Sequence, residues 1–522
     1  MSVFTQRKRF IGGVSQIATF KACLLLLTGT LPLWTFAQNV REAWVARFAL
    51  RATDQAFALA VDSWGNVHVT GLSTSIGVGL GYLTVKYDTN GNRLWGVGYD
   101  PLPNSEHGAT AIAVDRAGNV YVTGYEWNSI NRDYATIKYD ANGRQLWVAR
   151  YNGPGRNWDV ARAIAVDEAG NVYVTGYSGG IGTRSDYLTI KYDTNGNQLW
   201  VARYDGPANL DDVPYAIAVD SVGSVYVTGY SVGNGTNHDY ATVKYDANGN
   251  QLWVARYHNG PLTRRDDRAY ALAVDSAGSV YVTGFSDTAN NPLEYNYDYV
   301  TIKYDTNGNQ LWVARYNGPS NRNDVACAVA VDRVGNVYVT GSSESTTPLE
   351  DYVTVKYDAN GNQLWVARYN GSGDSADTPI GIAVDHAGNA YITGSSIGIG
   401  TDYDYATVKY DANGSQRWVM RYNGSDNRQD FARAIALDSA GSVYVTGYSV
   451  SSTTGSDYVT IKYVQSPAGD VNGSGCVDDS DLLAVLFAFG NTWTNLPEDL
   501  NRDGIVDDAD LLIVLFDFGS GC

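Results

Sequence analysis

The 522-residue chain is poor in two residue types that often carry catalysis or bind metals, with five histidines and four cysteines. It contains no phosphate-binding loop, no zinc-binding motif and no serine-nucleophile elbow. The enzyme classes that depend on these motifs are therefore not indicated. Catalytic groups, if the chain has any, must be sought among its acidic residues or its few histidines.

Positive charge is also scarce. The formal net charge is −18, and residues 470–522 hold eleven acidic side chains against one basic residue, Arg502. The preceding part of the chain is only mildly acidic. Because a nucleic-acid partner requires a positive field, we expect none.

Long apolar runs are missing except near the N-terminus. Residues 1–37 combine a basic start, an apolar stretch at 22–33 and the small-residue end Thr35-Phe36-Ala37, which is the pattern of a secretory signal peptide. The apolar stretch is short for a membrane span. We therefore expect cleavage near Ala37, export to the extracellular space or cell surface, and no membrane span in the mature chain.

Between the two ends, one unit is repeated eight times with a period of 52–57 residues. Its four segments are typified by AIAVD, GNVYVTG, DYxTIKYD and NGNQLWVARY. The aspartates that close the first segment are Asp62, Asp115, Asp167, Asp220, Asp275, Asp332, Asp385 and Asp438. The tryptophans of the fourth segment are Trp44, Trp95, Trp147, Trp200, Trp253, Trp312, Trp365 and Trp418.

Each segment is predicted to form a β-strand, because β-branched and aromatic residues alternate over five to seven positions. Asp-x-x-Gly-Asn and Asp-Ala-Asn-Gly-Asn sequences join the strands as tight hairpins. Four strands in about 50 residues match one propeller blade. Trp44 precedes the first unit, and the last unit ends at Tyr463 without a fourth segment. The two incomplete ends complement each other, which favours a closed ring over an open solenoid with exposed strand edges.

Residues 44–463 resemble the bacterial SBBP-type β-propeller repeats, and more loosely the NHL repeats, through the AVDxxGNVYVTG and YDxNGNQLW strings. The resemblance implies an all-β fold, an eight-bladed β-propeller over residues 38–464 with four-stranded antiparallel blades. We expect the N-terminal strand to be the outer strand of the last blade. Propellers host many unrelated functions, so the resemblance implies little about activity.

Loop lengths distinguish the two faces of this propeller. The loops between the second and third strands vary, as in 125–134 and 285–299, and so do the loops between units, as in 151–163 and 257–271. Both kinds lie on one face, whereas the other face carries short, nearly identical turns. Variable loops on a rigid scaffold usually carry binding, so we expect the variable face to hold the ligand.

Residues 465–469 are predicted to be a linker, and residues 470–522 a separate domain with two related segments, DVNGSGCVDDSDLL and DLNRDGIVDDADLL. Each segment spaces oxygen-bearing side chains as a calcium loop does and is followed by a helical pattern. Two calcium ions are therefore expected. The predicted ligands of the first are Asp470, Asn472, Ser474, the Cys476 carbonyl, Asp478 and Asp481. Those of the second are Asp499, Asn501, Asp503, the Ile505 carbonyl, Asp507 and Asp510.

A duplicated loop and helix with aspartate at the twelfth position resembles a type I dockerin over residues 468–522. The resemblance implies a small α-helical domain that docks, with calcium, onto a cohesin-like or cell-surface protein, commonly in polysaccharide-degrading assemblies. Ser474 departs from the usual aspartate, and the helices lack the basic residues common in dockerins. Calcium binding therefore follows more directly than cohesin binding does.

The cysteines divide between the parts of the chain. Cys23 leaves with the signal peptide, and Cys327 is predicted to be a buried, inert residue of a strand. Cys476 and Cys522 both lie in the C-terminal domain. In an exported domain of this size they either form a disulfide or remain two free thiols.

The repeated aromatic residues are interpreted as packing between blades rather than as sugar-stacking faces, because one position is filled in every unit. The YDxNGxxLW string also resembles the tryptophan-docking motif of eight-bladed quinoproteins, but no quinone ligands are identifiable. Aspartates also recur before the third-segment tyrosine, and Gly81 interrupts their series in the first unit. Their repetition favours a role in the fold over cation or sugar binding. These aspartates are Asp133, Asp186, Asp239, Asp298, Asp351, Asp404 and Asp457.

Two functional hypotheses remain. The favoured one is a non-catalytic propeller that binds a glycan or a protein on its variable face. The alternative is a glycoside hydrolase or polysaccharide lyase carried into a complex by its dockerin-like domain, which requires paired carboxylates. No pair stands out among the loop acids, which are Glu126, Asp211, Asp212, Glu294, Glu344 and Glu350.

Overall fold

The computed structural model describes residues 39–519 apart from 51–52, 75–78, 103–104, 156, 261–264, 290–294, 346–348, 468, 473, 475, 493–495 and 501–503. The predicted signal peptide lies outside these residues. The chain divides into a large unit, Val40–Gln465, and a small unit that includes the described residues from Ser466 onward. Among the described residues, no helix has the length and apolar character needed to cross a membrane.

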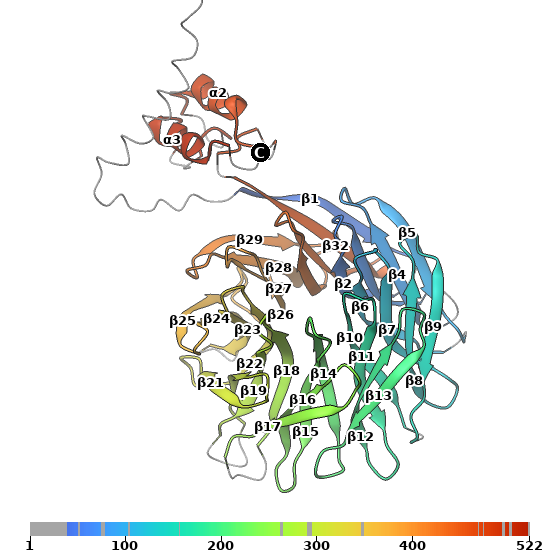
Figure 1. The fold of residues 1–522 in the computed structure, drawn as a ribbon. Helices are drawn as coiled ribbons and strands as arrows, with labels where there is room; N and C mark the ends of the chain where they lie inside the picture. Colours follow the sequence, from blue (N-terminus) through green and yellow to red (C-terminus); the bar gives the residue numbers. More distant parts are fainter. Residues whose placement is uncertain are drawn as a thin grey trace, which may run out of the picture. The chain divides into compact units, whose positions relative to one another are not determined.

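The large unit is an eight-bladed β-propeller, as the repeat predicts (Figure 1). Each blade is a four-stranded antiparallel sheet whose strands follow the order of the four sequence segments. The first strands of successive blades contact one another, which places them innermost.

The strand bounds of blades one to four are β2 (Asp54–Val61), β3 (Val67–Ser73), β4 (Gly81–Tyr87), β5 (Arg93–Tyr99); β6 (Gly108–Val114), β7 (Val120–Trp127), β8 (Arg132–Tyr139), β9 (Gln145–Tyr151); β10 (Asp159–Val166), β11 (Val172–Gly179), β12 (Ser185–Tyr192), β13 (Gln198–Tyr204); β14 (Asp212–Val219), β15 (Val225–Val232), β16 (His238–Tyr245) and β17 (Gln251–Tyr257). Those of blades five to seven are β18 (Asp267–Val274), β19 (Val280–Asp287), β20 (Tyr297–Tyr304), β21 (Gln310–Tyr316); β22 (Asp324–Val331), β23 (Val337–Glu344), β24 (Glu350–Tyr357), β25 (Gln363–Tyr369); β26 (Asp377–Val384), β27 (Ala390–Ile397), β28 (Tyr403–Tyr410) and β29 (Gln416–Tyr422).

Blade eight closes the ring with strands from both ends of the propeller sequence. It has the order β1-β32-β31-β30, formed by β1 (Asn39–Phe48), β32 (Gly455–Ser466), β31 (Val443–Ser451) and β30 (Asp430–Leu437). In Figure 1 the blue strand β1 accordingly lies beside β32, which belongs to the other end of the colour scale. The prediction that the N-terminal strand completes the last blade is confirmed.

The core lies between the blades, in layers shared by each neighbouring pair. In one such layer Tyr134 and Ala149 of blade two pack with Val172, Leu188 and other side chains of blade three, all of them buried. Burying an aliphatic side chain of this size contributes roughly 1.5–3 kcal/mol. The ring is therefore held by eight repeated interfaces, so every blade depends on both of its neighbours.

The repeated tryptophans belong to these interfaces, as the sequence interpretation proposes. In blade one, the Trp95 indole N–H and the Lys86 ammonium group both donate to the Ala141 carbonyl in the turn of blade two. The turn residue Gly143 has a φ of 84°, and a Cβ there would lie 2.8 Å from the Trp95 ring. Only glycine therefore fits beneath the indole. The same tryptophan and lysine contacts recur around the ring.

The junction between blades seven and eight achieves this contact differently, because β32 has no following turn. There the side chain of Gln465 supplies the acceptor: its Oε1 atom lies 2.6 Å from Lys409 Nζ and 3.3 Å from Trp418 Nε1. Its amide N–H group donates to the Gly441 carbonyl at 2.9 Å. A side chain thus replaces a missing backbone carbonyl.

The small unit contains two short helices, α2 (Asp479–Ala488) and α3 (Asp508–Asp517), which follow the two acidic segments where the sequence predicts helices. Asp478 and Asp507 cap their N-termini. Val477, Val485, Val506 and Val514 form its buried core. Cys476 is disulfide-bonded, and its partner lies outside the described residues. The pairing with Cys522 therefore stays a prediction.

Candidate functional site

Conserved positions of the repeat build a polar network on the variable face. In blade three, Arg203 on β13 donates to Asp186 Oδ2 at 2.7 Å and to the hydroxyl of Ser178 at 2.8 Å. Equivalent ion pairs join Arg256 with Asp239, Arg368 with Asp351, Arg421 with Asp404 and Arg47 with Asp457. The recurring aspartates at these five positions therefore join neighbouring strands of the same blade, in agreement with the interpretation of a role in the fold.

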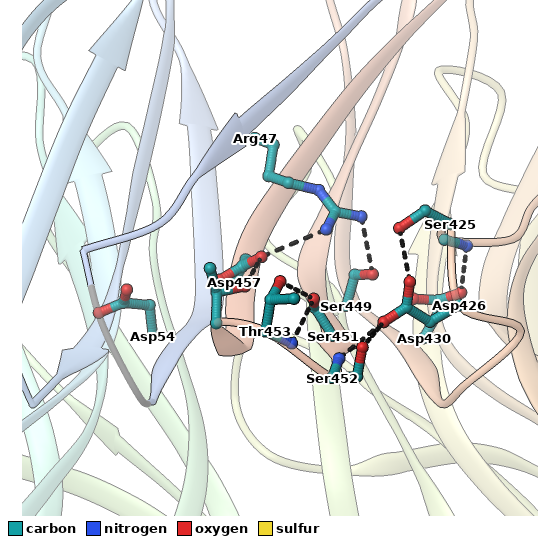
Figure 2. A network of polar contacts seen from close by, with 12 residues as sticks. Arg47, Asp54, Ser425, Asp426, Asp430, Ser449, Ser451, Ser452, Thr453 and Asp457 are labelled. Carbon is teal, nitrogen blue, oxygen red and sulfur yellow. Dashed lines mark hydrogen bonds and ion pairs between the residues drawn. The ribbon is translucent and has the colours of Figure 1, made fainter.

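Figure 2 shows this network where the ring closes. Arg47, carried by β1, donates to Asp457 of β32 at 3.2 Å and to the Ser449 hydroxyl of β31 at 3.0 Å. Its guanidinium also donates to Tyr422 of blade seven at 3.0 Å. One arginine thus joins three strands of blade eight to the neighbouring blade.

A second set of aspartates starts the first strand of most blades. Asp159, Asp267 and Asp430 are fully buried, and each accepts a hydrogen bond from a backbone N–H group of the preceding loop. Burial raises the pKa of Asp267 and Asp430 to about 6. A buried carboxylate beside other acids is costly to ionise, and burial also raises the pKa of Asp159.

The junction of blades one and two departs from this pattern. His107 takes the place of the first-strand aspartate, and Gly81 that of the third-strand aspartate. His107 is buried with its Nε2 atom 3.6 Å from the carboxylate of Asp100. Glu126 is buried nearby, where it accepts from Tyr99 at 2.7 Å and from Arg150 at 2.5 Å. Glu126 is thus held by two donors, whereas both carboxylate oxygens of Asp100 are buried without a hydrogen-bond donor, because His107 Nε2 lies closer to the Leu102 carbonyl, at 3.1 Å.

Every first strand contains a β-bulge, and the bulged residue is the position that varies most between the otherwise similar first strands. The eight bulged residues are Phe57, Thr110, Arg162, Tyr215, Tyr270, Cys327, Ile380 and Arg433. A bulge re-aims a side chain and often lies next to a binding site. The sequence interpretation missed this set, although its variation directly before the nearly constant AIAV segment was a readable signal.

The bulge of blade three contributes to a cavity of about 570 Å³ on the variable face between blades two, three and four. The guanidinium of Arg162 lies 4.9 Å from the ring centre of Tyr215 and 5.3 Å from that of Tyr177. Trp158 at the wall is 49% exposed, and Arg132 stacks on its face at 4.6 Å. The cavity is lined by Ile130, Asn131, Asn157, Trp158, Arg162, Tyr177, Arg184, Ser185, Asp211, Val213 and Tyr230.

This lining combines aromatic faces, guanidinium groups and amides with a single carboxylate. Asp211 is that carboxylate, and Arg184 donates to it at 3.2 Å. An aromatic wall with a few polar groups is the usual composition of a site for a small or extended polar ligand. The cavity offers no second carboxylate for paired acid-base chemistry.

A second cavity, of about 740 Å³, lies between blades five and six on the same face. It brings together Asp298 and Glu344, one of the acids considered from sequence. Burial raises the pKa of Asp298 to about 6, whereas Asn323 donates to Glu344 at 2.8 Å and Arg322 lies 3.9 Å from it. The two carboxyl groups therefore have different environments.

Glu350 is half-buried on β24, directly opposite Glu344 of β23, and burial, together with the Glu344 charge, raises its pKa. The structure thus brings these two candidate acids together. Asp212 is buried at a different blade junction, and Glu294 lies outside the described residues. His68 contacts Asp62 at 3.2 Å, and His238 contacts Asp266 at 2.5 Å. Each of these two histidines thus has its own acidic partner within the fold.

In the small unit, the twelfth-position aspartates fold back into their loops. Asp481 accepts hydrogen bonds from the backbone of Val471, Asn472 and Asp478 at 2.8–3.0 Å. Asp510 makes the matching contacts with Leu500 and Asp507. Both carboxylates are fully buried.

Oxygens of the first loop also converge. The Ser474 backbone N–H group donates both to Asp470 and to Asn472, at 2.9 and 2.8 Å, and the Cys476 carbonyl accepts from the Ser474 hydroxyl. Such an oxygen-rich set fits a hard cation. In the second loop Asp499, Ile505 and Asp507 are described, whereas Asn501 and Asp503 lie outside the described residues. Calcium binding by both loops stays a prediction.

Comparison with known proteins identifies the repeats. The model of the SBBP beta-propeller repeat matches residues 146–182, 199–235, 312–350, 364–401 and 420–452. An uncharacterized WD repeat-containing protein of Acanthamoeba polyphaga mimivirus is 24% identical over 439 residues, covering 67% of this chain and 30% of that protein. The regulatory protein FlaEY of Caulobacter vibrioides is 29% identical over 150 residues, which are 26% of this chain and 15% of that protein. The aligned parts thus span less than a third of either relative.

Solved structures are similar at low sequence identity. Sqt1 from Chaetomium thermophilum superposes with a TM-score of 0.49 at 11% identity, over 81% of this chain and 99% of that one. The polysaccharide lyase Uly1 superposes with a TM-score of 0.42 at 12% identity, over 67% and 89% of the two chains. Neither likeness bears on function. Five segments of the chain are thus SBBP beta-propeller repeats, and the large unit folds into an eight-bladed propeller.

Proposed function

We propose that the propeller is a non-catalytic binding module for a glycan, which it holds in the cavity between blades two, three and four. The observation that carries this proposal is the exposed indole of Trp158 beside the guanidinium groups of Arg132 and Arg162. An exposed aromatic face can stack on the apolar face of a sugar ring. Guanidinium and amide groups can donate to hydroxyl or carboxylate oxygens.

The proposal is tested by affinity electrophoresis of the full chain through gels that contain different polysaccharides. We expect retardation in at least one gel, its loss in Trp158→Ala and in Arg162→Ala, and its persistence in two matched controls. Trp64→Ala removes a 58%-exposed tryptophan from a turn of the opposite face, and Arg433→Ala removes the bulged arginine of blade eight. Absence of retardation in every gel, or equal retardation of the Trp158 and Trp64 variants, would sink the proposal.

The alternative is a polysaccharide hydrolase or lyase, and the observation that favours it is the cavity with Asp298 and Glu344. A general acid requires a carboxyl group with a raised pKa, as Asp298 has. Its partner is a second carboxylate held by hydrogen-bond donors, as Glu344 is. Product release by the wild-type chain, abolished in both Asp298→Asn and Glu344→Gln, would establish this function in place of the first. Asp298 also belongs to the repeated series of aspartates, which is why binding remains the favoured function.

For the small unit, we propose that its two loops bind calcium and that it attaches the exported chain to a cohesin-like or cell-surface protein. The converging oxygens of Asp470 and Asn472 support calcium binding. Calorimetry should show that the double variant Asp470→Ala, Asp499→Ala takes up two calcium equivalents fewer than the wild-type chain. Mass spectrometry of exported protein should show a chain that begins at Gln38. Equal calcium uptake by the two chains would remove the basis for the docking proposal.

A further inference from the structure

Three carboxylates converge at the junction of blades three and four, outside the calcium loops. They are Asp186 near the start of β12, Asp205 directly after β13 and Asp212 at the start of β14. One oxygen of each lies within 4.8 Å of an oxygen of the other two. This is the one such group among the described residues.

The group contains a buried oxygen that lacks a hydrogen-bond donor. Asp186 and Asp212 are fully buried, whereas Asp205 is exposed. Asp186 uses its Oδ2 atom to accept from Arg203 at 2.7 Å and from Thr183 at 3.0 Å. Its Oδ1 atom is buried without a donor. The Oδ1 atom of Asp212 is buried without a donor in the same way, as are those of equivalent aspartates at other junctions. A buried carboxylate oxygen is costly unless it is hydrogen-bonded or coordinates a cation. At this junction two such oxygens occur together with a third carboxylate, and this combination favours a cation.

Charge at the junction is unbalanced in the same direction. Arg203 is the cation bonded to this group, through Asp186, whereas Arg256 acts on Asp212 only through its charge, so three carboxylates have one directly bonded guanidinium. A divalent cation would neutralise the remaining two charges. Calcium takes six to eight oxygens at 2.3–2.6 Å and accepts carboxylates, carbonyls and water. Oxygens within 4.8 Å of one another can all reach one such ion.

Position 205 is where this junction differs from its neighbours. The equivalent residues of blades two, five, six and seven are Asn152, Asn317, Asn370 and Asn423. Acid recurs at this position in Asp100 of blade one, but there Gly81 and His107 replace the other two aspartates. At the junction that contains Asp100, the other two carboxylates are therefore absent. Among the described residues, all three carboxylates occur together only at the junction of blades three and four.

We propose that Asp186, Asp205 and Asp212 bind a calcium ion between blades three and four. The exposed Asp205 gives the ion access from solvent, and the two buried aspartates fix it between the blades. Ser185 and Asp211, the neighbours of two ligands in the sequence, line the cavity of the variable face. The ion would therefore also anchor the two segments that form one wall of this cavity.

Two exchanges of asparagine and aspartate test the proposal in the full chain. Asp205→Asn installs the residue found at four other junctions, so the fold tolerates it, and should lower calcium uptake by one equivalent in calorimetry. Asn423→Asp should raise uptake by one equivalent. The junction of blades seven and eight matches the proposed site in Asp404, Asp430 and Arg421, with Arg421 donating to Asp404 at 2.9 Å and Gly424 N–H to Asp430 at 2.6 Å.

The expected result is one equivalent lost and one gained, with a calcium-dependent rise in the melting temperature that Asp205→Asn abolishes. Equal uptake by the wild-type and Asp205→Asn chains would overturn the proposal. Unchanged uptake by Asn423→Asp would overturn the claim that a third carboxylate completes the site. The double variant of the C-terminal loops removes the two calcium equivalents of those loops, whereas Asp205→Asn removes the one between the blades. Retardation by polysaccharides is measured in a separate experiment. Failure of the interblade calcium site can therefore be distinguished from failure of either proposed function.

Discussion

The guanidinium of Arg47 lies 3.2 Å from the carboxylate of Asp457, although 410 positions separate the two residues in the chain. The contact repeats the arginine–aspartate pair of the other blades, but here it joins the first strand of the propeller to its last (Figure 2). Asp457 is buried, with 2% of its side chain exposed. Ring closure thus relies on the same local chemistry as blade formation.

Arg47→Ala should therefore destabilise the propeller. It leaves the buried carboxylate of Asp457 without its guanidinium donor, and we expect the free energy of unfolding to fall by about 2–3 kcal/mol. The control is Arg41→Ala, an exposed residue of the same strand β1, for which we expect a change within about 0.5 kcal/mol. Denaturant unfolding of both variants measures the difference. Equal stability of the two would mean that this pair does not hold the ring closed.

Gln465→Ala should weaken the ring at another point of blade eight. It removes the acceptor that Trp418 and Lys409 share, and burial already lowers the pKa of Lys409 to about 8. We expect a loss of about 1–3 kcal/mol in unfolding free energy. Gln465→Glu keeps the acceptor oxygens and should retain most of the stability, whereas Gln198→Ala, at an exposed position of β13, should change little. Thermal unfolding distinguishes these variants, and a Gln465→Ala chain as stable as the Gln198 control would contradict the role given to the side chain.

Much of this architecture could be predicted from the sequence, because a repeat specifies each local structure eight times. The spacing of Trp44 and Tyr463 was enough to predict closure by the N-terminal strand. The packing role of the tryptophans followed from their presence in every unit. The partner of Trp418 could not be predicted in this way, because Gln465 lies where the repeat ends and replaces a backbone group by a side chain.

The candidate sites were less accessible to sequence reasoning. The bulge that re-aims Arg162 leaves no mark in the hydrophobic alternation, so the cavity beside Trp158 was not foreseen. The convergence of Asp186, Asp205 and Asp212 depends on how two blades pack, which the spacing of residues in one chain does not show. The sequence does show that Asp205 stands where four other units have asparagine.

Stability should depend on pH through the buried aspartates of the blade junctions. Burial raises the pKa of Asp133, Asp267, Asp298 and Asp430 to about 6 in the folded chain, against roughly 3.9 in an unfolded chain. Between pH 4 and 6 the folded state therefore binds more protons than the unfolded state, and the free energy of unfolding falls as pH rises. Buried His68, whose pKa burial lowers, acts in the opposite direction. So do the turn aspartates whose pKa is lowered by hydrogen bonds from asparagines, such as Asp88 and Asp246, but their contribution falls off above roughly pH 4, where aspartates of the unfolded chain are already ionised.

Thermal unfolding of the full chain in a calcium-free buffer should accordingly show a melting temperature that decreases from pH 4 to pH 6. Asp267→Asn mimics the protonated carboxyl group and should make this slope shallower. Asp88→Asn is the matched control, because hydrogen bonds from Asn92 lower the pKa of this surface aspartate, so its removal should not make the decrease shallower. A melting temperature that stays level or rises between pH 4 and 6 would contradict the raised pKa values of the junction aspartates in the folded propeller.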